Sequence, residues 1–139
     1  MKINIVGDPI AKARHRSTRA GRMYNPQSKE EAAAIWFIQQ QKPVNFEPFT
    51  CPLAVTVNAV FTRPKAHYGT GRNAGKLKPS APKECVNPKD CDNILKFYTD
   101  AMNKIIYDDD RQCISMTATK RWAVGAELPN VEIVVEEFK

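Results

Sequence analysis

The sequence predicts an α/β (α+β) fold: a mixed β-sheet with helices packed on it, in the chain order strand, helix, strand, helix, strand, strand. Alternating apolar residues, which are typical of half-buried strands, occur near the start, in the middle and twice near the end of the chain. Two segments between them carry apolar residues at helical spacing. The length of 139 residues and the hydrophobic content of 42% fit a single domain that spans residues 1–139.

The first strand is expected at the start of the chain. Met1, Ile3 and Ile5 alternate with residues that would face the other side, and Gly7-Asp8-Pro9 is a turn sequence that ends the pattern. The segment 12–22 that follows is rich in basic residues and has almost no apolar residue to bury. We therefore expect a basic loop there.

The first helix is expected from Ser28 to about Gln41. Ser28 and Glu31 have the spacing of a capping box, in which two side chains accept hydrogen bonds from free backbone N–H groups at a helix start. Apolar residues then recur at helical spacing, and Pro43 prevents continuation. The clearest strand covers residues 53–62. Every second residue in it is apolar and would fall on one face, namely Leu53, Val55, Val57, Ala59 and Phe61.

Residues 63–89 are expected to form a long basic loop, because seven glycines and prolines interrupt them and many lysines accompany them. Loops of this length are usually functional or mobile. A second helix fits residues 92–106, and two strands follow at 114–118 and from 131 to about 138. The apolar face of this helix would consist of Ile94, Phe97, Tyr98, Ala101, Met102 and Ile105.

The charges divide the chain into a basic part and an acidic part. Residues 1–89 contain 15 Lys and Arg against 5 Asp and Glu, whereas residues 90–139 contain 6 against 10. A basic surface attracts phosphate backbones, and an acidic cluster within such a protein suggests cations held near that phosphate. An ordinary solvated surface explains the charges equally well until the acidic residues are considered one by one.

Several classes of protein do not fit the composition. The four cysteines include no C-x-x-C pair and only two histidines are present, so we expect buried thiols and no zinc site. No apolar run approaches the ~20 residues of a membrane span, and no signal peptide is visible, which predicts a soluble cytoplasmic or nuclear protein without a membrane partner. Gly75-Lys76 lacks the rest of a P-loop, so no nucleotide cofactor is expected.

Acidic residues flank the second helix. Asp90 and Asp92 stand at its start, and Lys96 lies one turn further in. Asp92, Lys96 and Asn103 fall along one stripe opposite the apolar face, so all three can point into one groove. A lone aspartate at such a position more often caps the helix. However, residues 108–110 are three aspartates beyond the other end, where the helix dipole disfavours them; a turn explains one, but three in succession attract a cation.

Clustered carboxylates without cysteine or histidine partners match Mg²⁺ or Mn²⁺. Such ions bind a phosphodiester, activate water and stabilise the leaving oxygen. A structural calcium site is the alternative, but the D-x-D-x-D-G loop of an EF-hand is absent. The acidic residues therefore favour a catalytic metal site, with Mg²⁺ or Mn²⁺ as the expected cofactor.

These motifs resemble those of a known family. The run Asp90-x-Asp92-Asn93-x-x-Lys96, followed by an amphipathic helix and Asp109-Asp110-x-Gln112, is similar to the signature of RusA-type Holliday-junction resolvases. The opening Gly7-Asp8-Pro9-x-x-Lys12-x-Arg14 and residues 24–41 resemble the family's first strand, basic loop and first helix, and residues 65–89 look like the extended loop of some phage or viral members. Cys91 stands where the family pattern has an apolar residue, and Asp108 makes the usual pair of aspartates a triplet.

The resemblance implies a RusA-like fold and a Mg²⁺-dependent endodeoxyribonuclease that acts in DNA recombination and repair. Such enzymes are homodimers that resolve four-way DNA junctions by paired symmetric nicks. Asp90, Asp92 and Asp110 would then be catalytic metal-binding carboxylates, Asp109 would support them, and Lys96 would be the catalytic lysine.

The basic segment supplies the expected DNA contacts, and the dimer contact is expected around Trp36 and Phe37. Two alternatives remain, a non-enzymatic basic nucleic-acid-binding protein and a nuclease that acts on flaps, forks or RNA. Carboxylates that face phosphate repel it, which favours the enzyme over the pure binding protein. The expected DNA-binding residues are Lys12, Arg14, Arg16, Arg19 and Arg22.

Overall fold

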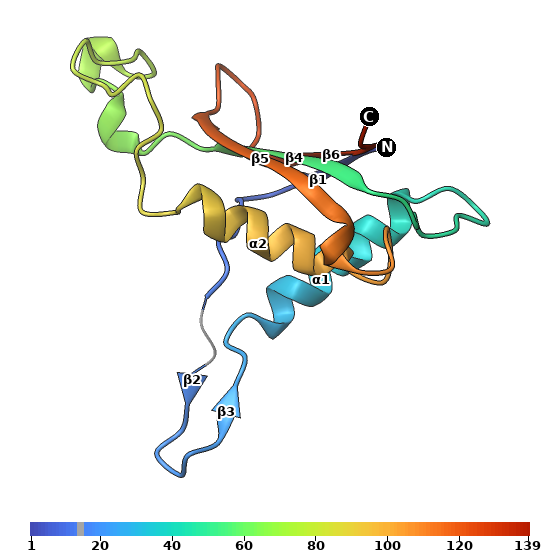
Figure 1. The fold of residues 1–139 in the computed structure, drawn as a ribbon. Helices are drawn as coiled ribbons and strands as arrows, with labels where there is room; N and C mark the ends of the chain where they lie inside the picture. The colour runs from blue at the N-terminus through green and yellow to red at the C-terminus, as the bar shows by residue number, and fades with distance from the viewer. Residues whose placement is uncertain (14–15) are drawn as a thin grey trace.

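The computed structural model, which describes residues 1–13 and 16–139, has a four-stranded sheet with two helices on one of its faces (Figure 1). The predicted mixed fold and the predicted order of its main elements are confirmed. A two-stranded hairpin, β2 (Arg16–Ser17) and β3 (Met23–Tyr24), projects from this body. The main elements are β1 (Lys2–Val6), α1 (Ser28–Gln41), β4 (Leu53–Phe61), α2 (Cys91–Met102), β5 (Cys113–Trp122) and β6 (Asn130–Glu137).

The sheet has the strand order β1-β6-β4-β5. β4 and β5 are parallel and joined by α2, whereas β6 pairs antiparallel with both β4 and β1. Parallel pairing requires a crossover, and the helix between the two strands provides it. The carboxyl end of β5 therefore lies beside that of β4, where Phe61 pairs with Trp122, and α2 runs back in the opposite direction.

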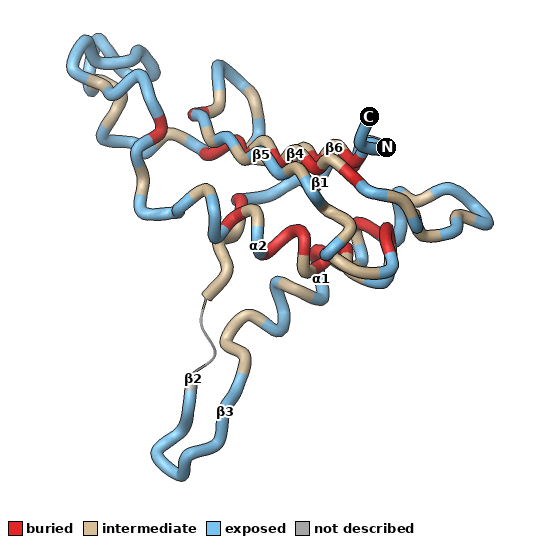
Figure 2. The backbone as a smooth tube through the Cα atoms, in the orientation of Figure 1, coloured by how far each residue is buried: buried red, intermediate tan, exposed pale blue. Residues whose placement is uncertain are grey.

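The core fills the space between the sheet and the helices, as the buried segments in Figure 2 show. β4 alternates strictly at its start, and Leu53, Val55 and Val57 are at most 1% exposed. α2 contributes Ile94 and Phe97, each 1% exposed, together with the other apolar residues of its predicted face. The sheet face opposite the helices carries mainly polar residues, so burial is one-sided, as the period of two in β1, β4 and β6 predicts.

The predicted capping box at the start of α1 is wrong. Gln27 is the N-cap residue, and no side chain forms a capping hydrogen bond. The Glu31 carboxylate instead accepts hydrogen bonds from Lys12 and from the side-chain amide of Asn25, because the preceding segment folds back against this turn. The helix bounds themselves agree with the prediction.

The segment between β1 and α1 also differs from the expected basic loop. Its distal part forms the β2–β3 hairpin, closed by hydrogen bonds between the backbones of Thr18 and Arg22 and of Gly21 and Thr18. Its proximal part is held by Gln27, whose side chain accepts from the Ala13 N–H at 2.8 Å and donates to the Ala11 carbonyl at 2.8 Å. Residues 11–13 are thus held at the start of α1.

α2 ends at Met102, four residues before the predicted end. Lys104 adopts the left-handed conformation with φ of 69°, which breaks the helix. The amides of Ile105 and Ile106 both donate to the Met102 carbonyl, so the apolar residues that suggested a longer helix pack in a turn instead. β5 is longer than predicted, and a bulge opposite Leu53 and Ala54 interrupts its regular pairing where Ile114, 58% exposed, lies.

Residues 63–89 contain two short 3₁₀ turns, Lys65–His67 and Gly71–Asn73, and otherwise irregular backbone. This is the segment for which the sequence predicts a long basic loop. Within the described residues, no helix is long and apolar enough to cross a membrane.

Candidate active site

Asp90 and Asp92 lie at the amino end of α2, exposed to solvent. Asp90 is the N-cap residue, yet its side chain forms no capping hydrogen bond, and the backbone carbonyl alone accepts from Ile94. The ordinary explanation for an aspartate at this position, helix capping, therefore does not apply. In the described part of the chain, neither carboxylate has a hydrogen bond or an ion pair with a side chain, so both are available to an external ligand.

Lys96 lies one turn along α2 from Asp92. Its ammonium group is 3.1 Å from Asp100 Oδ1, and its side chain is 58% exposed. Asp100 was not predicted as a site residue, although its i, i+4 spacing to Lys96 was a visible signal. Asp92, Lys96 and Asp100 together form a polar stripe at four-residue spacing along one side of the helix.

Lys12 joins this stripe to α1. Its ammonium group lies 2.8 Å from Glu31 Oε1 and 3.5 Å from Asp100 Oδ2, and its side chain is 23% exposed. The hydrogen bond to Glu31 raises the pKa of Lys12, with a smaller contribution from Asp100. Lys12 was expected to contact DNA, but in the structure its charge is balanced by these two carboxylates.

Asn103, expected on the same stripe, terminates α2 instead. It is half-buried, and its Oδ1 atom is buried without a hydrogen-bond partner among the described atoms. The predicted groove of Asp92, Lys96 and Asn103 is therefore replaced by the row of Asp92, Lys96 and Asp100. The early end of the helix is the reason for this change.

The three aspartates beyond α2 have different environments. Asp109 caps the 3₁₀ turn Asp110–Gln112: its Oδ1 atom accepts from the Arg111 amide at 2.9 Å and lies 3.2 Å from Arg111 Nε. These hydrogen bonds lower the pKa of the Asp109 carboxyl. Of the three aspartates, Asp109 is thus the one whose side chain stabilises a turn by capping it. Asp108 is exposed, and Asp110 is half-buried.

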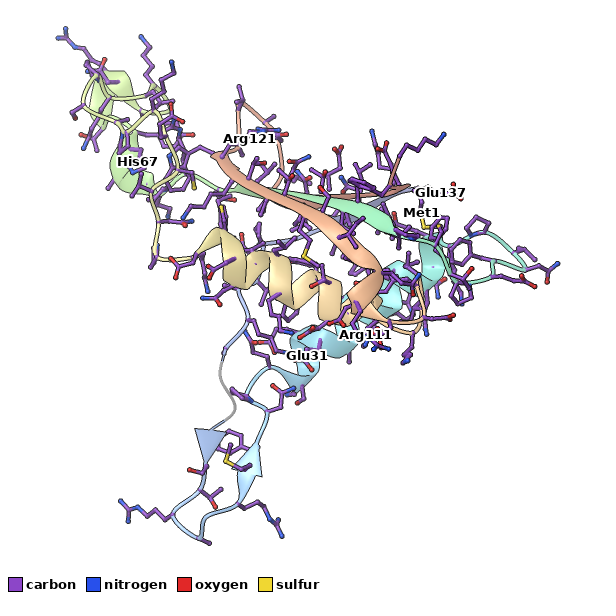
Figure 3. All side chains as sticks on the ribbon, in the orientation of Figure 1. Met1, Glu31, His67, Arg111, Arg121 and Glu137 are labelled. Carbon is purple, nitrogen blue, oxygen red and sulfur yellow. The ribbon has the colours of Figure 1, made fainter. Side chains whose placement is uncertain are left out.

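The two predicted acidic groups lie at opposite ends of α2. The helix has 12 residues, which corresponds to a length of about 18 Å. Figure 3 places Arg111, next to Asp110, at the carboxyl end of α2, far from His67 and Arg121 at the other end of the sheet. Among the residues that the structure describes, no group of three or more His, Cys, Asp or Glu side chains is arranged to hold a metal ion. One chain does not bring Asp90, Asp92, Asp109 and Asp110 together.

The remaining predicted DNA contacts belong to the hairpin. Arg14 lies outside the described residues, and only the backbone of Arg16 is described, in β2. Arg19 and Arg22 are exposed at the tip, and neither forms an ion pair within the described chain. Residues 17–24 of the hairpin are all exposed, as Figure 2 shows, so Arg19 and Arg22 face solvent.

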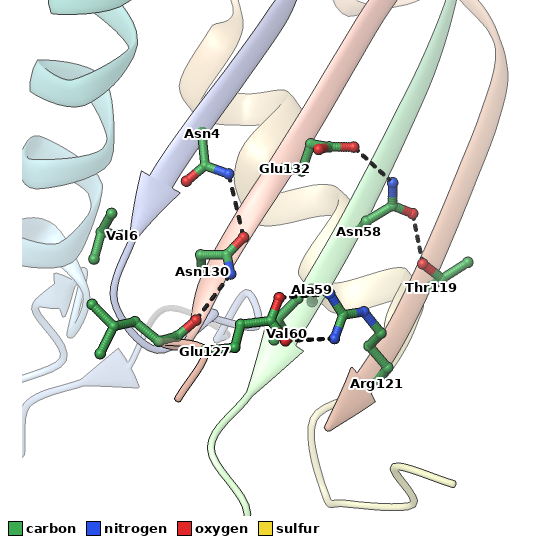
Figure 4. A pocket seen from close by; sticks show the side chains of 11 residues that line it. Asn4, Val6, Asn58, Ala59, Val60, Thr119, Arg121, Glu127, Asn130 and Glu132 are labelled. Carbon is green, nitrogen blue, oxygen red and sulfur yellow. Dashed lines mark hydrogen bonds and ion pairs between the residues drawn. The ribbon is translucent and has the colours of Figure 1, made fainter. Parts of the chain in front are cut away.

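A polar hollow of about 600 Å³ lies on the open face of the sheet and contains none of the predicted site residues (Figure 4). Its side chains bond to one another: Thr119 donates to Asn58 at 2.6 Å, and Arg121 forms two hydrogen bonds of 2.7 Å with Glu127. This arrangement lowers the pKa of Glu127 to about 2. Because these groups satisfy each other and lie on the face away from α2, the acidic site at the helix is the better candidate for chemistry.

Comparisons with known proteins agree with the motifs. A family model described as "Endodeoxyribonuclease RusA" matches residues 7–136, nearly the whole chain. The chain is also 29% identical over 148 aligned residues to "Uncharacterized protein YqaN" of Bacillus subtilis (strain 168), and the alignment covers 99% of this chain and 96% of that relative. The family match covers all of the acidic residues at both ends of α2.

Proposed function

Because the chain belongs to the RusA family of endodeoxyribonucleases, we propose that it is a Mg²⁺-dependent homodimer that resolves Holliday junctions by paired nicks. The observation that carries this proposal is the pair of carboxylates at the amino end of α2, Asp90 and Asp92, which have no structural role as helix caps. A nuclease needs such groups, whereas a protein that only binds DNA is weakened by negative charge beside phosphate.

The residues present fit a magnesium ion. Mg²⁺ is usually held by one or two carboxylates and keeps several waters, so Asp90 and Asp92 are sufficient protein ligands. Their exposure leaves room for a phosphodiester and for water. When bound, the ion would neutralise phosphate charge and lower the pKa of a coordinated water. Manganese fits the same oxygen ligands.

The other polar residues of the stripe have separate roles in this proposal. Lys96, more than half exposed and one turn from Asp92, neutralises charge that develops on the phosphate. Asp100 orients Lys96 through the 3.1 Å ion pair. Asp109 shapes the turn after α2, which sets the position of Asp110, and Asp110 provides a third carboxylate for the metal.

Two copies of the chain explain how separated groups act together. Asp110 lies at the opposite end of α2 from Asp90 and Asp92, so it reaches their metal ion only if a second copy places its own Asp110 there. A four-way junction has near two-fold symmetry, and a symmetric dimer presents two equivalent sites to two equivalent strands. Trp36, 56% exposed on α1, provides apolar surface for such a contact.

Replacing Asp92 by asparagine tests the catalytic assignment. Asp92→Asn retains the size of the side chain but removes the charge that holds the metal. We expect nicking of a synthetic four-way junction in Mg²⁺ to fall by at least about a hundredfold. Junction affinity without metal should stay the same or increase, because one repulsive charge is gone. A single-turnover nicking assay and a gel shift in EDTA measure the two effects on the same preparation.

Glu136→Gln is the matched control, because Glu136 is an exposed carboxylate on β6 and lies outside the acidic site. It should nick at the parent rate. Folded Asp92→Asn that nicks at the parent rate would contradict the catalytic assignment. Substrates of fork, flap and linear duplex DNA in the same assay determine whether the four-way junction is the preferred target, and junction binding without any cleavage would support the pure binding protein instead.

A further inference from the structure

Residues 63–89 form a lobe beyond the end of the sheet, next to the turn that follows β5 (Figure 1). Its backbone is folded on itself: Tyr68 bridges to Leu77, the Gly69 amide donates to Lys76, and the Lys78 amide donates to His67, both at 2.9 Å. A Cβ atom at Gly69 would lie 2.5 Å from Asn73 Cβ, so only glycine fits this turn. The lobe therefore presents its side chains from a defined backbone.

The lobe is fastened to the carboxyl end of β5. Trp122 Nε1 donates to the Glu84 carbonyl at 3.0 Å, and Lys120 Nζ donates to the Lys89 carbonyl at 2.7 Å. Arg63 covers the Trp122 ring at 5.7 Å from its centroid and donates to the Pro82 carbonyl at 2.7 Å. Lys89 immediately precedes Asp90, so the lobe is attached directly beside the acidic end of α2.

A hollow of about 630 Å³ lies between the lobe and the turn after β5, within the range of ligand pockets. Its walls combine apolar and aromatic side chains with cations. A second hollow of about 520 Å³ shares Tyr68 with the first and is bordered by Lys65. The first hollow is lined by Tyr68, Leu77, Trp122, Val124, Arg63, Lys83 and Arg121, with Gly75, Gly125 and Ala123 between them.

The positive charge of the lobe favours binding of an anionic ligand. Residues 63–89 contain seven Lys and Arg and one glutamate. Arg63 and Arg121 are already engaged, with Pro82 and Glu127. Lys65 and Lys83 are exposed and, within the described chain, have no ion pair or side-chain hydrogen bond, so they are available to phosphates. A flat aromatic ring beside free cations suits a nucleobase with its flanking phosphates.

We propose that this hollow binds a single nucleotide unstacked from the DNA branch, with the base against Tyr68 and Leu77 and the flanking phosphates on Lys65 and Lys83. The proposal rests on the proposed function, since it takes branched DNA as the ligand. Bases at a branch point lose part of their stacking, so an aromatic side chain can receive one at lower cost than from a continuous duplex. The lobe then positions the branch beside Asp90 and Asp92.

The test uses fluorescence anisotropy with labelled single-stranded oligothymidylate in EDTA, so that no cleavage occurs. Tyr68→Ala should weaken binding by about five- to a hundredfold, the range for loss of one stacking ring. Tyr68→Phe should bind like the parent, because the ring and not the hydroxyl makes the contact. The control Phe138→Ala removes an aromatic residue that is 51% exposed near the C-terminus and should bind unchanged. Lys65→Gln combined with Lys83→Gln should make the dependence of log affinity on log salt less steep by about 1.4 units.

Several outcomes would overturn the proposal. Parent-like binding by folded Tyr68→Ala, or equal losses for Tyr68→Ala and Phe138→Ala, would exclude a stacking site. If Tyr68→Ala lost affinity for labelled polyglutamate as strongly as for oligothymidylate, the hollow would be a site for acidic peptides. If Tyr68→Ala nicked the junction and bound oligothymidylate as the parent does, the nucleotide site would be rejected and the proposed nuclease activity would stand. If the parent protein nicked no junction but Tyr68→Ala still lost affinity for oligothymidylate, the nucleotide site would be supported and the proposed function would be contradicted.

Discussion

At the scale of single residues, Asp100 connects Lys96 of α2 with Lys12, which lies in the segment after β1. Its two carboxylate oxygens lie 3.1 Å from Lys96 and 3.5 Å from Lys12, and the latter also pairs with Glu31. The four side chains are each partly exposed, so the pairs contribute modestly to stability. Their main effect in our proposal is to position Lys96 on the side of α2 that also carries Asp92.

Asp100→Asn is therefore expected to impair cleavage more than folding. The free energy of unfolding should fall by at most about 1 kcal/mol, as for other partly exposed pairs. The single-turnover nicking rate should fall on the order of tenfold, because Lys96 loses the group that orients it, while junction affinity in EDTA changes little. Urea unfolding, the nicking assay and a gel shift measure the three quantities. Glu132→Gln removes the same charge on the opposite sheet face and serves as control; equal loss of nicking in both variants would exclude a positioning role.

At the scale of elements, the β2–β3 hairpin and the 63–89 lobe are the two basic extensions of the fold. Gln27 holds residues 11–13 at the start of α1, and the Lys12 amide donates to the Asn93 carbonyl of α2 at 2.8 Å. The lobe is attached through Trp122 and Lys120. The residues at which the two extensions leave the body, 11–13 and Lys89, thus lie next to the amino-terminal part of α2.

The exposed arginines at the hairpin tip should contribute to the salt dependence of DNA binding. Arg19→Gln combined with Arg22→Gln removes two exposed cations at the tip, and the slope of log affinity against log salt should become less steep by about 1.8 units for duplex arms. Anisotropy titrations of a four-way junction at several salt concentrations measure this slope. Lys139→Gln, an exposed cation at the C-terminus, should leave it unchanged. An unchanged slope in the double variant would remove the hairpin tip from the DNA interface.

At the scale of the whole molecule, the separation of the acidic groups along α2 is the main argument for two cooperating chains. Asp90 and Asp92 lie at one end of this 12-residue helix and Asp110 lies beyond the other, whereas the oxygens that bind one Mg²⁺ lie about 2 Å from the ion. A symmetric dimer also explains how a small chain makes two cuts in one junction. The exposed Ile114 and Met116 on the edge strand β5 and Trp36 on α1 are apolar surfaces that such an assembly can bury.

Mixing active and inactive subunits tests this arrangement. Dimers formed from parent and Asp92→Asn chains should contain one competent site and should nick only one strand of a cruciform in a supercoiled plasmid. Excess Asp92→Asn should thus convert the product from linear DNA, which needs two nicks, to nicked circles. Gel electrophoresis separates these products. Sedimentation that shows only the 15.7 kDa species at concentrations giving full resolution would argue against the dimer.

The sequence by itself predicted the main helices and strands and, through the spacing of its motifs, the family. The period of two in β1 and β4 and the helical period from Ile94 to Met102 are local patterns, because each side chain's face follows from its own position in the element. The aspartate motifs and Lys96 identified the family for the same reason, since their spacing is part of the sequence. The bounds of α2 were less predictable, because Ile105 and Ile106 can be buried by a turn as well as by a helix.

Only the tertiary structure decided which partners the charged residues have. Lys12 pairs with Glu31 and Asp100, 19 and 88 residues further along the chain, so carboxylates from two other elements balance its charge. The attachment of the 63–89 lobe to Trp122 and the separation of Asp92 from Asp110 depend equally on how the crossover from β4 to β5 is packed. Contacts between distant residues depend on the packing of whole elements, and a side chain's type and spacing do not specify them.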